Sequence, residues 1–473
     1  NYIFVNKIKN YPNNSYLFSW SEFKNGYEKR CIISKNSFYY TNKILALIKK
    51  KYKFFFFFLK LQASQEVVLN SLKKYILNKI YNYFFVYFVI KELKKNKVNF
   101  TFINFNQDFI FFEKIIKLFF KEKVAYKDYS KKKFFLPIKK IFTILFYPVY
   151  CIIASSGFIF KKKIYKLAIR IYNAGFNFKT SPSIVWPIKN KKNIKNKSLL
   201  VCEDALNKNF LEDLREQKID YIFSTNKNPI NLINFYYLFF SSFLFFRNLI
   251  FCFFLFKVNY FLLCYIETFF VSFFKWKKFV SVIKLDKYIA YHNYSFDHII
   301  RNYLFKLNNC KTLHYKHSFS ENLYGNPKNY NNYIYGYCSY DTEFHWAKCS
   351  EDMSLIDKSC SKNFICNGPL ANQYKYFVKK KISKKKTITF FTTQLGTQDS
   401  VCSFINHEKF LKFILKFSKD KNNFIILKPK YKLKRIRKNY PRIYKIVLEL
   451  KKVSNIKVIE NKSAEYIISF SDF

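Results

Sequence analysis

Short apolar runs alternate with amphipathic stretches along the second half of the chain. From residue 198 onward, four apolar runs have the length of a strand: 198–204, 220–226, 287–293 and 311–318. Two stretches between them, 207–218 and 295–307, carry apolar residues at helical spacing. Strand–helix alternation with short connections is typical of βαβ units, so this part predicts a mostly parallel sheet. The aromatic-rich 331–339 and the run 362–370 predict further strands, and we expect one α/β domain over 191–380.

A second series of the same kind follows a Lys-rich connector. Strands are predicted at 387–394, 423–430 and 455–461, and amphipathic helices at 406–420 and 441–453. The closing residues, 465–473, predict a fourth strand. We therefore expect a second α/β domain over 386–473 that holds the first half of a sheet. The chain starts at Asn1 rather than Met, so we interpret it as a fragment whose second domain is truncated.

Two apolar regions raise the question of membrane contact. Residues 141–160 carry no charge, have lysines on both sides, and are about long enough to span a bilayer, although Pro148 and Gly157 interrupt them. The region 230–280 predicts an apolar helical insertion in the first domain, and residues 1–190 predict a mixed helical region that is also a candidate for membrane contact. Basic flanks on apolar helices favour peripheral contact with an anionic membrane surface. A true span and helices buried in a soluble core remain alternatives.

Composition weakens the interpretation that the high positive charge indicates binding to nucleic acid. The chain has 61 Phe and 39 Tyr but 7 Gly, and its formal net charge is +54. Residues with A/T-rich codons are favoured throughout, so nucleotide bias accounts for much of the Lys and Phe. No DNA- or RNA-binding motif accompanies the charge, and we expect no nucleic acid partner. The cysteines form no C-x-x-C pair and the acids no Asp-x-Asp motif, so we expect no bound metal.

Polar residues gather where the predicted strands end. In the first series these are Lys316-His317-Ser318 and Asn367-Gly368-Pro369. In the second series they are Thr392-Thr393, Lys428-Pro429-Lys430, and then Ser469 and Ser471. In an open α/β sheet, ligands bind at the carboxyl ends of the strands, so these residues are the candidate site.

Two α/β domains in tandem, with these motifs in this order, resemble the two-domain glycosyltransferases called GT-B. The resemblance covers about 198–473. Within GT-B it looks most like bacterial enzymes of surface-polysaccharide (capsule or lipopolysaccharide) biosynthesis, including sialyltransferase-like and CDP-glycerol glycerophosphotransferase-like families. It implies two Rossmann-like domains, the first on the acceptor side and the second on the donor side, whose strand ends face one cleft.

The resemblance also implies roles for individual residues. His317 would be the catalytic base that takes the proton from an acceptor hydroxyl. The donor phosphate and nucleotide would be bound by Lys428, Lys430, Thr392, Thr393, Ser469 and Ser471. Asn367 and Gly368 would form a turn in the cleft. The chain departs from the family pattern beside His317, where Gln and Gly are usual, and at Lys430, where His is usual.

The activity that the resemblance implies is metal-independent transfer of a sugar from a nucleotide-activated donor to a surface-polysaccharide or lipid-linked acceptor. We expect no cofactor, because the nucleotide is part of a substrate, and we expect a location at the cytoplasmic face of the inner (cytoplasmic) membrane. Two alternatives stay open. One is a polyol-phosphate transferase of the teichoic-acid type, and the other is a non-catalytic, membrane-bound subunit of polysaccharide assembly.

Overall fold

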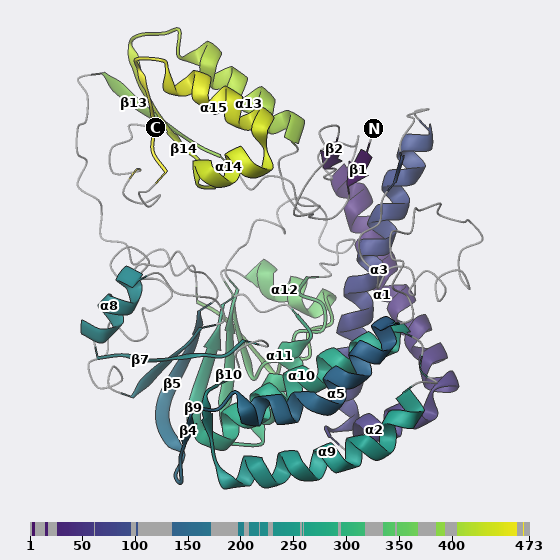
Figure 1. Cartoon of the computed structure of the whole chain (residues 1–473). Helices are drawn as coiled ribbons and strands as arrows, with labels where there is room; N and C mark the ends of the chain where they lie inside the picture. The colour runs from purple at the N-terminus through teal and green to yellow at the C-terminus, as the bar shows by residue number, and fades with distance from the viewer. Residues whose placement is uncertain are drawn as a thin grey trace.

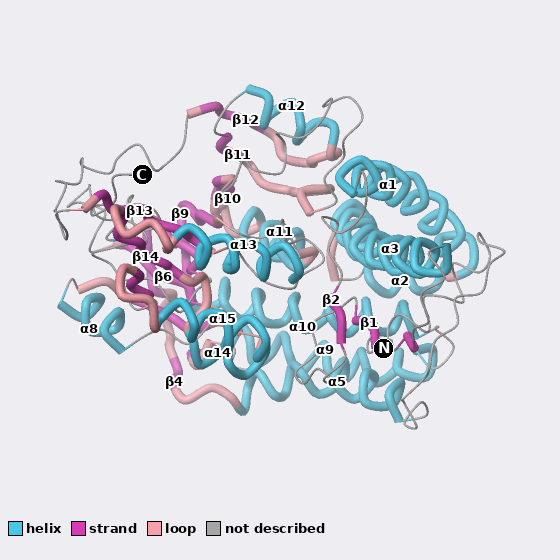
Figure 2. Tube along the Cα trace, turned by 90° about the horizontal axis from the view of Figure 1, so that it is seen from above, coloured by secondary structure: helices cyan, strands magenta, loops and turns pink. Residues whose placement is uncertain are grey.

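The computed structural model describes most of the chain, in segments that carry the secondary structure discussed below. The described residues are 2–4, 15–17, 26–60, 62–95, 101–102, 135–171, 197–202, 208–216, 218–225, 230–255, 258, 260–291, 295–316, 334–345, 348–367, 385–392, 404–460 and 467. Figure 1 shows the arrangement of these segments, and Figure 2 shows them from above.

Seven strands form a parallel sheet in the order β12-β11-β10-β9-β5-β6-β7. Their bounds are β5 Lys163–Ile171, β6 Ser198–Cys202, β7 Asp220–Phe223, β9 Ile283–Ala290, β10 Lys311–Tyr315, β11 Thr342–His345 and β12 Asn363–Cys366. Every residue of β6 is buried, which explains its unbroken apolar sequence, because a parallel strand is covered on both faces. Separate apolar clusters cover the two faces, one of them with Leu214 of α8 (Lys208–Glu216).

A second parallel sheet has the order β13-β14-β15 and a core of its own. Its elements are β13 Lys386–Phe391, α13 Phe404–Phe417, β14 Asn423–Lys428, α14 Leu433–Asn439, α15 Pro441–Lys451 and β15 Ile456–Val458. Leu411, Ile425 and Ile443 are completely buried in that core. Two parallel sheets with interleaved helices confirm the predicted α/β class.

The remaining elements are mostly helices that pack beside the larger sheet (Figure 1). They are α1 Gly26–Lys51, α2 Lys53–Lys60, α3 Gln65–Lys95, α5 Phe135–Ile153, α9 Phe235–Leu255, α10 Tyr260–Val282, α11 Asp297–Lys306 and α12 Lys348–Ile356. Short strands form two further sheets, from β1 (Tyr2–Phe4), β2 (Ser15–Leu17) and β3 (Thr101–Phe102), and from β4 (Gly157–Phe158) and β8 (Leu232–Ile233). The apolar insertion predicted over 230–280 is thus a pair of helices, α9 and α10.

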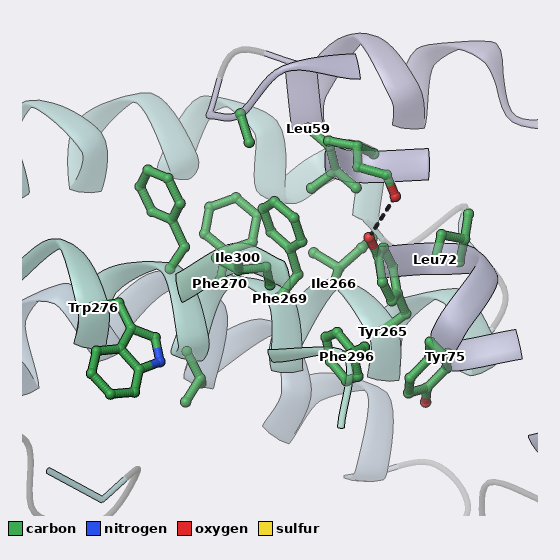
Figure 3. Close-up of a cluster of buried hydrophobic side chains, with 14 of the residues drawn as sticks. Leu59, Leu72, Tyr75, Tyr265, Ile266, Phe269, Phe270, Trp276, Phe296 and Ile300 are labelled. Carbon is green, nitrogen blue, oxygen red and sulfur yellow. Dashed lines mark hydrogen bonds between the residues drawn. The ribbon is translucent and has the colours of Figure 1, made fainter. Parts of the chain in front are cut away.

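Helix α10 is buried along nearly all of its length and joins the helical elements to the sheet. Figure 3 shows Tyr265, Phe269 and Phe270 of α10 packed among side chains of α2, α3 and α11. The Tyr265 hydroxyl lies 2.7 Å from Ser71 Oγ of α3. Helices from the first hundred residues therefore share one hydrophobic core with the first sheet. No helix in the described part of the chain has the length and apolar character needed to cross a bilayer.

Two features of the first sheet differ from the sequence prediction. The strand predicted over 331–339 is a turn at residues 334–337, and the strand that joins the sheet is β11, eight residues further on. The central strand β5 was not predicted, and it lies upstream of the predicted domain start at residue 191. The domain boundaries themselves stay a prediction.

The turn at 334–337 depends on Gly336. A Cβ atom at this position would lie 2.6 Å from the ring of Phe38 and 2.7 Å from a methyl of Leu77, both of which are buried. We expect Gly336→Ala to lower the free energy of unfolding by about 1–3 kcal/mol, because an overpacked core must shift. Urea unfolding followed by circular dichroism would measure this. Ala46→Ser, at an exposed position of α1, is the control, and equal stability of both variants would contradict the prediction.

Candidate functional site

The carboxyl edge of the second sheet brings together three of the predicted donor-binding residues. Phe391 of β13 is paired with Lys428 of β14, so the two strands end side by side. The Thr392 amide donates to the Lys428 carbonyl at 3.1 Å, and the Lys430 amide donates to Thr392 Oγ1 at 2.8 Å. The Thr392 hydroxyl accepts one bond in this arrangement and keeps its own hydrogen for another partner.

The Lys428 ammonium folds over the end of the neighbouring strand β15. Its Nζ donates to the carbonyl oxygens of Glu460 at 3.1 Å and Pro429 at 3.4 Å. An ammonium has three hydrogens, so these two bonds leave one donor for a ligand. Partial burial lowers the pKa of Lys428, the charge of Lys430 lowers it further, and the Glu460 carboxylate opposes both. A bound anion would stabilise the charged form of this lysine.

Glu460 is the carboxylate that faces this edge, and its charge is directed toward the backbone. Its Oε2 accepts a hydrogen bond of 2.7 Å from the amide of Leu433, the first residue of α14. The segment on either side of that amide is basic and exposed: Lys430, Lys432, Lys434, Arg435 and Arg437. The Arg435 guanidinium lies 4.1 Å from the centre of the Tyr431 ring. Lysines and arginines grouped around strand ends form a surface that suits a phosphate group.

Beside β11 of the first sheet lies a buried polar network around Glu343. This carboxylate accepts bonds from Ser354 at 3.3 Å, Ser359 at 2.5 Å and Ser361 at 2.5 Å. The ammonium of Lys316, also buried, donates to Ser354 Oγ. Lys316 directly precedes the predicted base His317. The network therefore fixes the residue that directly follows β10.

The sequence-predicted residues fall into two groups. Thr392, Lys428 and Lys430 meet at the edge of the second sheet, and Asn367 lies exposed at the end of β12, where its amide donates to the His345 carbonyl at 3.0 Å. The residues outside the described part of the chain are His317, Gly368, Thr393, Ser469 and Ser471. Their roles stay predictions.

Two residues near the site were not singled out from the sequence: Glu343 and Glu460. Glu460 carried a usable signal, because it lies in the strand predicted over 455–461 and therefore near the same edge as Lys428. Glu343 carried none, because its serine partners lie 11 to 18 residues away along the chain. Among the described residues, no group of three or more His, Cys, Asp or Glu side chains is placed to hold a metal ion.

No family model and no curated protein matches the chain. Solved structures similar to it include a glycosyltransferase from Rickettsia africae, with 11% identity and a TM-score of 0.35 over 66% of this chain and 72% of that one. The Anabaena protein HepE, in complex with UDP and glucose, has 11% identity and a TM-score of 0.35 over 63% and 70% of the two chains. A UDP-GlcNAc 2-epimerase from Neisseria meningitidis, bound to UDP-GlcNAc, has 13% identity and a TM-score of 0.36 over 65% and 75%. Similarity at this level assigns no activity, so the function rests on the residues at the strand ends.

Proposed function

We propose that the chain is a GT-B-type glycosyltransferase that moves a sugar from a nucleotide-activated donor to a glycan or lipid-linked acceptor. The observation that carries the proposal is the grouping of Lys428, Lys430 and Thr392 at the carboxyl edge of a parallel sheet. This edge is where α/β proteins bind ligands, and its basic side chains match the phosphates of a nucleotide-activated donor. We place the reaction in bacterial surface-polysaccharide synthesis, at the cytoplasmic face of the inner membrane.

In the proposed reaction, basic side chains stabilise the negative charge of the departing nucleotide. When the bond between sugar and phosphate breaks, negative charge grows on the departing nucleoside diphosphate. The Lys428 ammonium, with one donor to spare, would stabilise that charge more strongly than it stabilises the intact donor. The Thr392 hydroxyl would donate to a phosphate oxygen, and Lys430 would add a second positive charge. His317 would accept the proton of the attacking hydroxyl. No metal ion is required by these steps.

Binding of nucleoside diphosphates tests the donor site directly. We expect the chain to bind UDP, GDP or CDP, and Lys428→Ala and Lys430→Ala each to raise the Kd of the preferred nucleotide by roughly 10- to 100-fold, the loss of one charge-assisted hydrogen bond. Isothermal titration calorimetry would measure this. Lys445→Ala, an exposed lysine of α15 in the same unit, is the matched control and should bind like the parent chain.

The outcomes separate the candidate functions. Nucleotide binding that is lost only in Lys428→Ala and Lys430→Ala supports a donor site at this edge. Release of nucleoside diphosphate from a panel of nucleotide sugars would then identify a glycosyltransferase. Release of CMP from a CDP-activated polyol would identify the polyol-phosphate transferase, which would use the same phosphate contacts. A chain that binds no nucleotide, or binds it equally in all variants, would contradict both and favour a non-catalytic subunit.

A further inference from the structure

Helix α9 exposes its most apolar side to solvent. Phe235, Phe239, Phe243, Phe246 and Ile250 are spaced by three or four residues and therefore lie on one face, and each is at least 60% exposed. The buried side of the same helix is mixed, because it holds Tyr237 and Leu244 together with Ser241 and Asn248. Arg247, the single charged residue of α9, is half-buried. A surface helix ordinarily turns polar residues toward solvent, so the apolar exposed side of α9 departs from the usual pattern.

Neighbouring elements extend this apolar surface. Helix α5 exposes Phe142, Phe146, Tyr150 and Ile153 at the same helical spacing. It packs against α9, where the rings of Phe146 and Phe245 lie 5.7 Å apart. Beyond the end of α5, Phe158 lies 4.6 Å from Phe235, and Phe160 is 83% exposed. We name the exposed residues of α5, α9 and the 158–160 segment the aromatic face. Figure 1 shows α9 along the lower border of the molecule, with α5 above it.

The codon bias of the chain does not explain the aromatic face. The same composition gives α13 an exposed side with Lys409, Lys412 and Lys416. An ordinary water-facing helix in this protein therefore carries lysine. Helix α9 carries none, and isolated exposed apolar residues become significant when they form a continuous patch.

Basic side chains stand at one end of the aromatic face. The Lys277 ammonium lies 5.3 Å from the centre of the Tyr236 ring and 4.8 Å from that of Phe240. Lys162, two residues after Phe160, is close enough to Lys277 and Lys284 for their charges, after burial, to lower its pKa. Its Nζ donates to a neutral partner, Asn308 Oδ1, at 3.3 Å. Lysines that repel one another beside an apolar surface form a site for anionic headgroups.

We infer that the aromatic face lies in the headgroup region of an anionic lipid bilayer, with Lys162, Lys277 and Lys284 against the lipid phosphates. Aromatic rings favour this interfacial depth, and helices that lie in the plane of the interface need not cross the bilayer. The inference deepens the membrane contact of the proposed function, but it does not depend on transferase activity. It also orients the chain, because it places α5 and α9 against the membrane.

Co-sedimentation with lipid vesicles tests the surface and its charge preference. We expect the chain to sediment with vesicles of phosphatidylcholine containing about one third phosphatidylglycerol, and far less with phosphatidylcholine alone. The double variant Phe239→Ser with Phe243→Ser should lower the partition coefficient at least about tenfold, through lost apolar contact. Lys162→Gln with Lys277→Gln should remove most of the preference for anionic vesicles. Leu355→Ser, at a 56% exposed position of α12, is the control and should bind normally.

Three results would overturn the inference. They are no vesicle binding by the parent chain, equal binding by the Phe239 and Phe243 variant, and a lipid-free dimer that this variant converts to monomer. The last result would assign the aromatic face to a second copy of the chain. Nucleotide binding by the same variant should be unchanged, since the substituted residues are exposed and lie outside the second sheet. The failure of membrane binding and the failure of the donor site are therefore separable.

Discussion

Lowering the pH from 7 to 4.5 is expected to reduce the free energy of unfolding by about 2–3 kcal/mol through a single residue, His298. This histidine at the start of α11 is completely buried, and its pKa is lowered to about 3. Burial is the largest cause, followed by the positive charge of Arg301. Lys74 lowers the pKa further, while the Ser295 carbonyl and Asp297 oppose the shift.

The hydrogen bonds of His298 require its neutral form. Nδ1 lies 2.5 Å from the Ser295 carbonyl oxygen, so it carries the proton and donates. Nε2 accepts a bond of 3.2 Å from the Ser339 amide. A second proton would be placed on Nε2, where it would meet an N–H donor instead of an acceptor. Protonation therefore breaks the link between α11 and the segment that precedes β11.

The sign of the pH effect follows from the two states. The unfolded chain takes up the proton near pH 6.5 and the folded chain only near pH 3, so the contribution of His298 is fully present above pH 6.5 and is lost as the pH falls toward 3. Urea unfolding at pH 7 and 4.5 would measure it, with His298→Gln as the comparison, since glutamine keeps a donor and an acceptor but does not titrate. His407, in the second unit, has its pKa lowered to about 4 by burial, and His407→Gln separates its contribution. A pH dependence that is unchanged in His298→Gln would contradict this account.

Sequence analysis located strands with continuous apolar sequences, such as β6 and β14, although it missed β5, which is also largely apolar. The β6 sequence SLLVC and the β14 sequence NFIILK are runs that a parallel sheet demands, and both strands fall within the predicted ranges. Their helices were equally readable, because α13 and α15 separate an apolar face from a lysine face. The local pattern was sufficient for these strands and helices, because apolar core residues need no specific polar partner to be stable when buried.

The error around β11 comes from a residue whose burial depends on distant partners. Strand β11 has the sequence TEFH, and its buried Glu343 is stable because three serines from later segments donate to it. No local sequence pattern predicts such a strand. The aromatic run at 331–339 reads more strongly as a strand, but its rings pack on α1 and α3, with Tyr337 5.6 Å from Phe38. Tertiary packing therefore overrides local propensity at this point.

The candidate site, too, was predictable only in part from the sequence. The rule that parallel strands end at the same edge of a sheet was enough to predict that Thr392 and Lys428 lie side by side. In the structure a hydrogen bond of 3.1 Å joins their backbones. The contact between Lys428 and Glu460 needed the strand order as well, because β15 had to be the neighbour of β14. Helix α14, rich in lysine and arginine, was not predicted. The first amide of α14 donates to the Glu460 carboxylate, which lies 27 residues away in sequence, so no local pattern marks the start of this helix.

Trp276→Ala is expected to cost about 3–5 kcal/mol of unfolding free energy, the largest effect of any single substitution considered. Trp276 is the largest of the completely buried side chains and lies in the last third of α10 (Figure 3). Its ring is 5.5 Å from that of Phe279 and 5.6 Å from that of Phe305, and the Arg301 guanidinium lies 5.6 Å from its centre. Truncation would leave a cavity where α10, α11 and β9 meet, and it would remove a face on which a buried cation rests.

The matched variant is Trp276→Phe, which keeps an aromatic ring in the same place. The Trp276 Nε1–H has no hydrogen-bond partner among the described residues, so its loss leaves no acceptor there unsatisfied. We expect Trp276→Phe to cost less than about 1.5 kcal/mol. Urea unfolding followed by far-ultraviolet circular dichroism would compare the variants without relying on tryptophan fluorescence. Since α10 is the element that joins α2, α3 and the first sheet in one core, Trp276→Ala should shift a single transition for all of them. Two separate transitions in that variant would mean that the N-terminal helices fold apart from the sheet.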